Sequence, residues 1–458
     1  MSHSFFAQDT AWAERVLAYE AGQALTAGEL MAAAYELAQR LPKSAAVLNL
    51  CASRVAFLLG FVAAMWREQV TLMPSSHSAA TLDALQTQYP ELYVLSDDLV
   101  HHRAEIELPH VEVGMPSTTL AHTRDAKQIT LPQIAPERIV ARVFTSGSTG
   151  LPTGHDKRFG LLQFNSESQA IRLGFTGTER FCTVATVPVQ HMYGFESSFL
   201  LPLMSGHAFA AERPFYPADI ARVLAECPEP RVLVTTPVHL RVMLESQQNF
   251  PRLAALMSAT APLSPALARQ AESFFNAPLF EIYGCTEAGQ LSTRRSTHTT
   301  TWETYRGVVL KQQGDAVYAS GGHVEGSVAL GDYLQLHDET HFELLGRHED
   351  MINIAGKRSS LPYLNHHLLA VEGVQDGAFY LPPHSERLCA FVVCTQRPHG
   401  ADVQNKDKEQ LLQALRSRLD AVFLPRPLYF VNDLPRNATG KLTQQALQAL
   451  YAKCTNAS

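Results

Sequence analysis

The stretch VFTSGSTGLPTGHDK at residues 143–157 combines residue types that bind phosphate groups. Glycine allows the backbone to approach an anion, and hydroxyl groups add hydrogen bonds to phosphate oxygens. A Walker loop has lysine and a hydroxyl residue directly after its second glycine, whereas the first lysine here is Lys157. A solvated Ser/Gly linker is the alternative, but an apolar run, ERIVARVF, precedes the stretch. The pattern favours a nucleotide-binding loop made of Thr145, Ser146, Gly147, Ser148, Thr149 and Gly150.

Three later stretches place acidic, basic and aromatic residues close together. They are EIYGCTEAG at 281–289, LGDYLQLHDETHFELLGRHEDMINIAGKR at 330–358, and LPRNATGKL at 434–442. Carboxylates beside phosphate oxygens form the hard-oxygen environment that Mg²⁺ prefers, and a lysine after a flexible glycine can reach a developing negative charge. Taken singly, each stretch is more typical of a strand end or a solvated surface.

The elements that must position these residues alternate between strand and helix patterns. Short apolar runs typical of buried strands occupy residues 45–50, 91–96, 180–187 and 231–236. Helical patterns include a capping box from Thr26 to Glu29 and the apolar run 55–66, which is interpreted as a buried helix because it is too short to span a bilayer. This alternation predicts an α/β fold with largely parallel sheets.

The character of the chain changes after about residue 350. Shorter strand patterns there flank a charged helical pattern, KDKEQLLQALRSRL, and indicate a small α+β unit. We therefore expect two domains, residues 1–349 and residues 350–458.

Composition limits the classes of function. The chain has 458 residues, of which 46% are hydrophobic and 18% charged, and its net charge of −7 argues against a nucleic-acid partner. Its seven cysteines are scattered without CxxC spacing, which fits a reducing compartment and no zinc site. The first residues lack a basic start followed by an apolar core, so a signal peptide is not indicated. The expectation is a cytoplasmic protein with no membrane span.

In order and in separation, the four stretches resemble the signature blocks of the adenylate-forming enzymes, a superfamily of acyl- and aryl-CoA synthetases, nonribosomal adenylation domains and luciferases. The resemblance covers essentially the whole chain. It implies a large N-terminal domain of sheets flanked by helices and a small mobile α+β C-terminal domain. It also implies ATP and Mg²⁺ as cofactors: a carboxylate attacks the α-phosphate to give an acyl-adenylate and pyrophosphate, and a thiol then displaces AMP.

The resemblance assigns a role to individual residues of the nucleotide site. It places Tyr283 against the adenine, Thr286 on the nucleotide phosphate and Glu287 on the magnesium ion. Asp332 would accept hydrogen bonds from both ribose hydroxyls, and Arg347 would approach the ribose and the α-phosphate.

Three further assignments concern catalysis and movement. Lys441 would reach in from the small domain and bridge the substrate carboxylate and the α-phosphate, while Asp350 sits where the two domains of the family pivot. Thr153 stands where the family commonly has its loop lysine. We expect Lys157 to supply that charge instead.

The acid-binding pocket is expected between two segments. VPVQHMYGFE at 187–196 resembles the family segment that lines the acyl site, and SATAPLS at 258–264 should form the opposite wall. The candidates are His191, which is also a catalytic candidate, Tyr193, Gly194, Phe195, Thr260, Ala261 and Gly284. Aromatic side chains with few charges favour an apolar or aryl acid over an amino acid.

The acceptor thiol and the class of protein leave alternatives open. FTSGSTG with its delayed lysine is similar to ligases of bacterial aryl-polyene and xanthomonadin-type pigment pathways, which points to a hydroxybenzoate-like acid passed to the phosphopantetheine of an acyl carrier protein. Coenzyme A is the alternative acceptor. A nucleotide-binding relative that has lost ligation is the non-enzymatic alternative.

Overall fold

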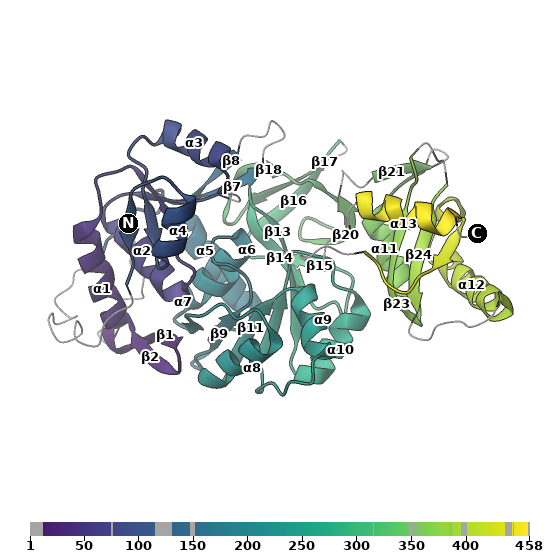
Figure 1. Ribbon diagram of the computed structural model, residues 1–458, viewed down its shortest axis with the longest axis horizontal. Coiled ribbons are helices and arrows are strands. Elements are labelled where there is room, and N and C mark those ends of the chain that lie inside the picture. Colours follow the sequence, from purple (N-terminus) through teal and green to yellow (C-terminus); the bar gives the residue numbers. More distant parts are fainter. Residues whose placement is uncertain are drawn as a thin grey trace.

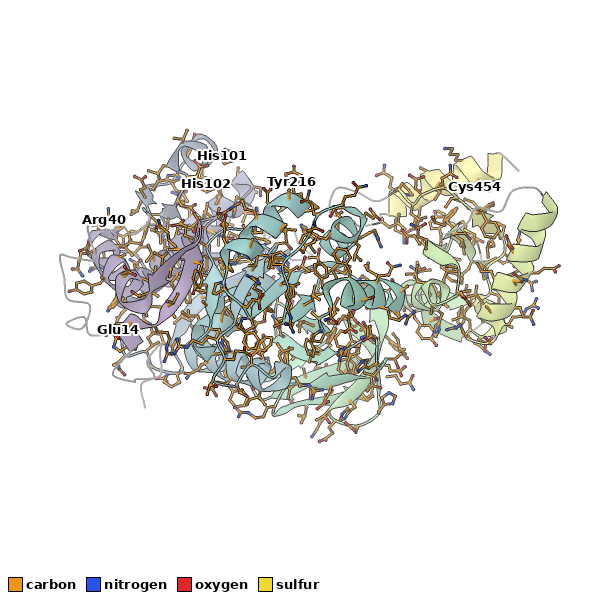
Figure 2. All side chains as sticks on the ribbon, turned by 90° about the horizontal axis from the view of Figure 1, so that it is seen from below. Glu14, Arg40, His101, His102, Tyr216 and Cys454 are labelled. Atoms are coloured by element: carbon orange, nitrogen blue, oxygen red, sulfur yellow. The ribbon has the colours of Figure 1, made fainter. Side chains whose placement is uncertain are left out.

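The computed structural model describes residues 12–74, 77–114, 131–146, 152–314, 316–347, 351–354, 357–383, 385, 387–394, 401–435, 442 and 444–456. A large N-terminal part and a small C-terminal part lie side by side along the longest axis of the molecule (Figure 1). In Figure 2 the labelled Arg40 and Glu14 lie at one end of this axis and Cys454 lies in the small part near the other.

The largest sheet of the described residues has eleven strands, parallel at its centre and antiparallel towards both edges. Their order is β19 (Asp332–Leu336), β20 (His341–Arg347), β15 (Trp302–Thr304), β14 (Gly289–Arg294), β13 (Leu279–Cys285), β12 (Ala255–Ser258), β11 (Arg231–Thr235), β9 (Cys182–Ala185), β10 (Ala208–Ala210), β1 (Val16–Glu20) and β2 (Gln23–Thr26).

Two further sheets complete the large domain. The six-stranded sheet has the order β6 (His110–Glu112), β5 (Val94–Ser96), β3 (Ala46–Asn49), β4 (Val70–Met73), β7 (Ile139–Ser146) and β8 (Pro152–Arg158). All its neighbouring strands are parallel except β7 and β8, which form an antiparallel hairpin. A three-stranded antiparallel sheet consists of β16 (Val308–Gln313), β17 (Ala316–Gly321) and β18 (Val324–Ala329).

Helices cover the sheets and fill the space between them (Figure 1). They are η1 (Trp12–Glu14), α1 (Ala27–Arg40), α2 (Arg54–Trp66), α3 (Ala79–Gln88), α4 (Leu99–Glu105), α5 (Phe159–Leu173), α6 (Met192–Gly194), the π-helical turn η4 (Phe195–Leu200), α7 (Leu201–Ser205), α8 (Pro217–Glu226), α9 (Pro237–Glu245) and α10 (Pro265–Phe275). One core joins α8, α9 and α10 to one face of the large sheet. Another places α1, α2 and η4 between the two large sheets.

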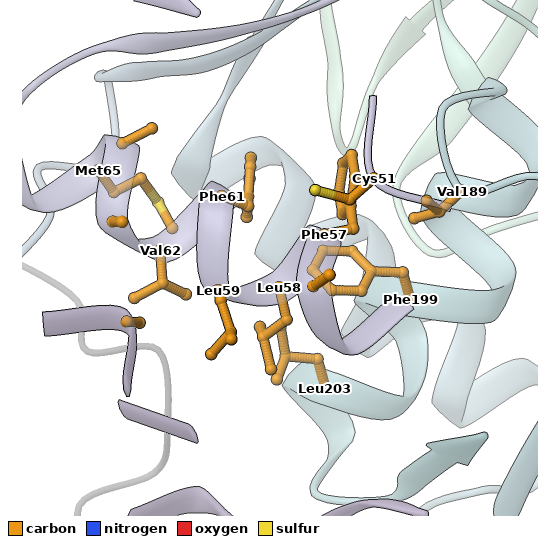
Figure 3. Packing of buried hydrophobic residues seen from close by; sticks show 14 of the residues in the cluster. Cys51, Phe57, Leu58, Leu59, Phe61, Val62, Met65, Val189, Phe199 and Leu203 are labelled. Atoms are coloured by element: carbon orange, nitrogen blue, oxygen red, sulfur yellow. The ribbon is translucent and has the colours of Figure 1, made fainter. Parts of the chain in front are cut away.

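The sequence features that predicted these helices act as expected. Thr26 accepts a hydrogen bond from the Glu29 backbone and the Glu29 carboxylate accepts one from Thr26 N, so both halves of the capping box start α1. The apolar run of α2 is buried on all sides, with Phe57 and Phe61 packed against Phe199 of η4 (Figure 3). A helix that is apolar all round belongs in a core.

The small domain has its own hydrophobic core. A hairpin of β21 (Met351–Ile354) and β22 (Lys357–Ser360) precedes a sheet of β23, β24 and β25. The remaining elements are α11 (Leu361–Leu369), β23 (Val374–Tyr380), β24 (Cys389–Cys394), α12 (Ala401–Arg416), η6 (Ala421–Phe423), β25 (Leu428–Phe430) and α13 (Gln444–Asn456). The two clusters that form this core contain residues of the C-terminal part alone.

The expected fold class is confirmed: an α/β protein with a large domain of sheets flanked by helices and a small α+β domain. The predicted runs 45–50, 91–96, 180–187 and 231–236 each contain a strand, respectively β3, β5, β9 and β11. The expectation of parallel pairing holds at the centre of both large sheets. Antiparallel pairs such as β13–β14 and β7–β8 continue the sheets beyond these parallel strands, because the two strands of each pair follow one another closely in the sequence.

Candidate active site

The segments predicted to bind ATP and acid meet at one edge of the large sheet. Strands β9, β11, β12 and β13 are parallel, so their carboxyl ends share an edge. The chain leaves those ends into the segments 186–195, 236–239, 259–262 and 286–288. Ligands of open α/β sheets bind outside the carboxyl ends of the strands.

The base of the phosphate loop is the β7–β8 hairpin. Thr145 pairs in register with Thr153, and Ser146 pairs with Pro152. Gly147, Ser148, Thr149 and Gly150 lie outside the described residues, as do Asp350 and Lys441. For Ser146 the structure describes the backbone. The predicted strand before the loop is therefore confirmed, and the contacts of the loop itself stay predictions.

Lys157 lies beneath the turn that carries Thr286 and Glu287. Its side chain is buried, and Nζ donates to the carbonyl oxygens of Thr286 at 2.5 Å and of Glu287 at 3.1 Å. Burial lowers the pKa of Lys157, and the carboxylate of Glu196 is the strongest of the neighbours that oppose this shift. The expected contact of Lys157 with phosphate stays a prediction, while its observed partners are backbone carbonyls.

His155 is a site residue that the sequence reasoning missed. Its Nε2 lies 3.0 Å from Thr145 Oγ1 and 3.7 Å from Glu287 Oε1. Burial lowers the pKa of His155, against the opposing effect of Glu287. The available signal was strand alternation, because residues 153, 155 and 157 of one strand share a face.

Tyr283 and Asp332 are brought together although 49 positions separate them. Tyr283 Oη donates to Asp332 Oδ2 at 2.8 Å, and the Tyr283 ring packs edge-on against Phe342. Asp332 is the direct cross-strand partner of Arg347 in the β19–β20 pair. The three residues assigned to adenine and ribose are therefore neighbours. Tyr283 contacts Asp332 by a side-chain hydrogen bond, and Arg347 is next to Asp332 by the backbone pairing of β19 and β20.

The last part of β13 requires a glycine at position 284. A Cβ there would lie 2.3 Å from the carbonyl oxygen of Gly289, because the register of β13 and β14 shifts at this point. Beside it, burial raises the pKa of Cys285 to about 12. A thiol that stays protonated is a poor nucleophile, so we assign Cys285 to the lining of the candidate site and not to catalysis.

The acid-site segment divides into buried and exposed residues. His191 is exposed at the start of α6, and Tyr193 is buried with Oη donating to Thr235 O at 3.1 Å. A Cβ on Gly194 would lie 2.0 Å from Pro188 O, so only glycine fits. The ring of Phe195 is fully buried and stacks on Phe199 in the core. Its role in binding the acid has no support from these contacts and stays a prediction.

Thr260 adopts a backbone conformation that is unusual for its type. Its φ is +75°, in the left-handed region that β-branched residues rarely occupy. Thr260 and Ala261 are both exposed, directly after β12. Strain of this kind costs of the order of 1–3 kcal/mol and clusters at functional sites, which is consistent with the expected wall of the acid pocket.

Glu196 connects the acid-site segment to the turn. It is 2% exposed, Oε1 accepts from Asn165 Nδ2 at 2.6 Å, and Oε2 accepts from Gln290 N at 2.9 Å. Burial raises the pKa of Glu196 to about 7, and Lys157 opposes the shift. The sequence reasoning quoted this residue without assigning it a role.

The raised pKa of Glu196 predicts a pH-dependent stability. Between pH 4.5 and about 7 the folded state holds a proton on Glu196 that the unfolded state has released, so this group makes the protein less stable as pH rises through that window. The shift corresponds to on the order of 3 kcal/mol. Glu196→Gln should remove this component from the free energy of unfolding, measured by urea denaturation at several pH values. Equal pH slopes in variant and wild type would contradict the assignment.

The donor set at Glu287 suits magnesium bound together with phosphate. No cluster of three or more His, Cys, Asp or Glu side chains that could hold a metal occurs within the described part of the chain. Mg²⁺ usually binds through one or two carboxylates plus substrate phosphates, and the Glu287 side chain is 39% exposed beside the phosphate hairpin. A single accessible carboxylate fits this mode of binding.

Comparisons with known proteins identify the family of the chain. Residues 5–315 match the profile of the AMP-binding enzyme family, and residues 366–441 match that of the AMP-binding enzyme C-terminal domain. A 4-coumarate–CoA ligase of Halorhodospira halophila is 32% identical over 310 residues, which cover 65% of this chain and 73% of that protein. One from Rhodobacter capsulatus is 28% identical over 297 residues, with the same coverage of both proteins.

A solved structure supports the fold. Apo MatB from Rhodopseudomonas palustris superposes with a TM-score of 0.79 at 19% identity, covering 98% of this chain and 97% of that one.

The chain therefore belongs to the AMP-binding enzyme family, the adenylate-forming enzymes that its sequence resembles. Within that family it is an AMP-forming acid–thiol ligase, which activates a carboxylic acid. The family match also supports the use of ATP. No helix in the described ranges combines the length and apolar character needed to cross a bilayer.

Proposed function

We propose that this ligase activates an aryl acid, such as a hydroxybenzoate, and passes the acyl group to a phosphopantetheine thiol. One contact carries the proposal: His155 Nε2 lies 3.0 Å from Thr145 Oγ1 and 3.7 Å from Glu287 Oε1. This contact puts the base of the phosphate loop beside the carboxylate expected to bind the metal. It supports nucleotide chemistry at the carboxyl edge of the large sheet.

In the first half-reaction a carboxylate oxygen bonds to the α-phosphorus as the bond to the bridging oxygen of pyrophosphate breaks. Residues 145–150 hold the departing pyrophosphate, and Thr286 donates to the nucleotide phosphate. Asp332 accepts from the ribose hydroxyls, with Arg347 beside it. When bound, Mg²⁺ supplies charge neutralisation at the phosphate oxygens, with Glu287 as its protein ligand. Positioning and charge neutralisation carry most of such catalysis.

Lys441 completes the charge balance of this step. Its ammonium bridges the substrate carboxylate and the α-phosphate as negative charge builds up between them. In the second half-reaction the thiol sulfur bonds to the acyl carbon, the bond to the AMP oxygen breaks, and the thiol proton is released.

The choice of an aryl acid rests on the relatives and on the segment 187–196. Two curated relatives are 4-coumarate–CoA ligases, whose named substrate carries an aromatic ring. His191 and Tyr193, with Thr260, Ala261 and Gly284 opposite, supply aromatic and small side chains rather than a carboxylate for an ammonium group. This composition favours an uncharged ring over an amino acid.

The acceptor is proposed to be the phosphopantetheine of an acyl carrier protein, as the form of the TSGSTG loop indicates. Free coenzyme A is the second candidate, and the names of the curated relatives favour it. Both acceptors present the same thiol.

The domain boundary is proposed at residues 349 and 350, with Asp350 as the hinge. Separate hydrophobic cores on the two sides support this division. A hinge residue must absorb a large backbone change while both domains stay folded.

Pyrophosphate release over a panel of aryl and fatty acids tests the proposal. We expect release with hydroxybenzoates or hydroxycinnamates, followed by thioester formation with either a phosphopantetheinylated carrier protein or coenzyme A. Release with fatty acids alone would overturn the aryl assignment. ATP binding without release for any acid would overturn the ligase function.

A further inference from the structure

Two side chains on one face of β8 contact the turn at Thr286 and Glu287. Alternate residues of a strand point the same way, so His155 and Lys157 share a face. His155 Nε2 lies 3.7 Å from Glu287 Oε1, and Lys157 Nζ contacts the carbonyl oxygens of Thr286 and Glu287. We refer to His155 and Lys157 together as the β8 clamp.

Lys157 holds the backbone of the turn. Its side chain is 7% exposed, and a buried ammonium needs hydrogen-bond acceptors to offset the loss of water. Two consecutive carbonyl oxygens supply them at 2.5 and 3.1 Å. Fixing both carbonyls fixes the two peptide planes, and therefore the direction in which the side chains of Thr286 and Glu287 leave the backbone.

His155 lies between the carboxylate of the same turn and the phosphate hairpin. Its Nε2 faces Thr145 Oγ1 at 3.0 Å on one side and Glu287 on the other. The imidazole therefore links the base of the loop to the predicted metal ligand. Thr153, at the usual place of the loop lysine, offers no positive charge here.

We propose that the β8 clamp positions the Thr286–Glu287 turn for the nucleotide, and that Lys157 acts through this turn rather than by binding the outer phosphates of ATP. The inference rests on the proposed function, because it assigns Thr286 to the phosphate that AMP and ATP share. Lys157 and His155 are thus positioning residues. They compensate for the missing loop lysine by orienting the Thr286–Glu287 turn, not by binding phosphate themselves.

Nucleotide affinity separates the two roles of Lys157. If Lys157 positions the turn, Lys157→Met should weaken the binding of AMP and of Mg²⁺-free ATP by the same factor, about tenfold for the loss of charge-assisted hydrogen bonds. If Lys157 binds the outer phosphates, only ATP binding should weaken. Isothermal titration calorimetry with AMP and with ATP, at a temperature well below the unfolding midpoint, measures both.

Arg158→Met is the matched control. Arg158 is the next residue, points away from the turn and pairs with Glu325 at the surface, so the control removes the same charge without touching the clamp. We expect its AMP and ATP affinities to equal those of the wild type. A loss confined to ATP, or no loss at all in Lys157→Met, overturns the positioning role of Lys157.

His155→Ala tests the clamp independently, since His155 is partly exposed and tolerates truncation better than a buried lysine. Its removal should leave AMP affinity unchanged but reduce the gain in ATP affinity on adding Mg²⁺ by about two- to fourfold. An undiminished Mg²⁺ effect overturns the role of His155.

These binding measurements need no acid, so the clamp and the proposed function can be refuted independently of each other. If the wild type binds AMP but activates no acid, the ligase assignment is wrong. The AMP and ATP affinities of the variants still decide whether the β8 clamp positions the turn.

Discussion

Lys441→Ala is expected to slow acyl-adenylate formation about 10²- to 10³-fold while sparing thioester formation. The reason is that the carboxylate and the α-phosphate both carry negative charge, and the lysine ammonium neutralises the charge that accumulates between them. The thiol step starts from a mixed anhydride that is already activated, so it does not need this ammonium. Pyrophosphate release measures the first step, and thioester formation from supplied acyl-adenylate measures the second.

Lys453→Ala provides the matched control for this prediction. Lys453 is an exposed residue in the last turn of α13, also in the small domain, and its removal changes the charge of that domain equally. Both half-reactions should proceed at the wild-type rate in this variant. If Lys441→Ala slowed the two half-reactions by the same factor, the lysine would serve folding or domain closure and not adenylation.

Arg54→Met is expected to destabilise the protein by on the order of 3 kcal/mol, because it leaves several buried carbonyl groups without a donor. Arg54 is 1% exposed at the first position of α2. Its guanidinium donates to Ala185 O, Val187 O and Glu212 O, and to Ser198 Oγ, at 2.6 to 3.2 Å. Urea denaturation of wild type and variant measures the difference.

The buried charge of Arg54 is itself unfavourable, which indicates that the residue serves to position the segment it binds. Burial, together with a smaller effect of the charge on Arg213, lowers the pKa of Arg54 to about 9. A positive charge at a helix N-terminus is also unfavourable. Its bonds to Val187 and Ser198 fasten both ends of the segment that carries His191 and Tyr193.

Arg40→Met controls for the loss of an arginine. Arg40 is exposed at the end of α1 (Figure 2), and its removal should change the free energy of unfolding by less than about 0.5 kcal/mol. Arg54→Lys should fall between wild type and Arg54→Met, because one ammonium has three donors for four acceptors. Equal stabilities of Arg54→Met and Arg40→Met would refute the stabilising role of the Arg54 hydrogen bonds.

Local features of the chain were predictable because they depend on neighbouring residues. The capping box at Thr26 and Glu29 and the apolar run of α2 are short-range patterns, and both formed as expected. The family was recognisable for a related reason. Each of the four signature stretches is a continuous segment whose residue types and order can be compared directly with those of the family.

Long-range pairs were not predictable. Lys157 contacts the backbone of Thr286, 129 positions away, and Arg54 contacts Val187, 133 positions away. Backbone carbonyls are present at every position and leave no trace in the sequence, so a buried cation that binds them cannot be matched with its partner. His155 was missed because no strand was predicted at residues 152–158, so side-chain alternation was not considered there.

The sequence by itself determined the α/β class, the plan of a large and a small domain, and the family, since hydrophobic period and residue chemistry are local properties. The tertiary structure alone decided which residues meet: Tyr283 with Asp332, His155 with Glu287, and Lys157 with a backbone turn rather than an exposed loop. The physical reason is that these pairs join segments far apart in the sequence. His155 and Lys157 lie in the six-stranded sheet and their partners follow β13 of the eleven-stranded sheet, so the contacts depend on how the two sheets pack.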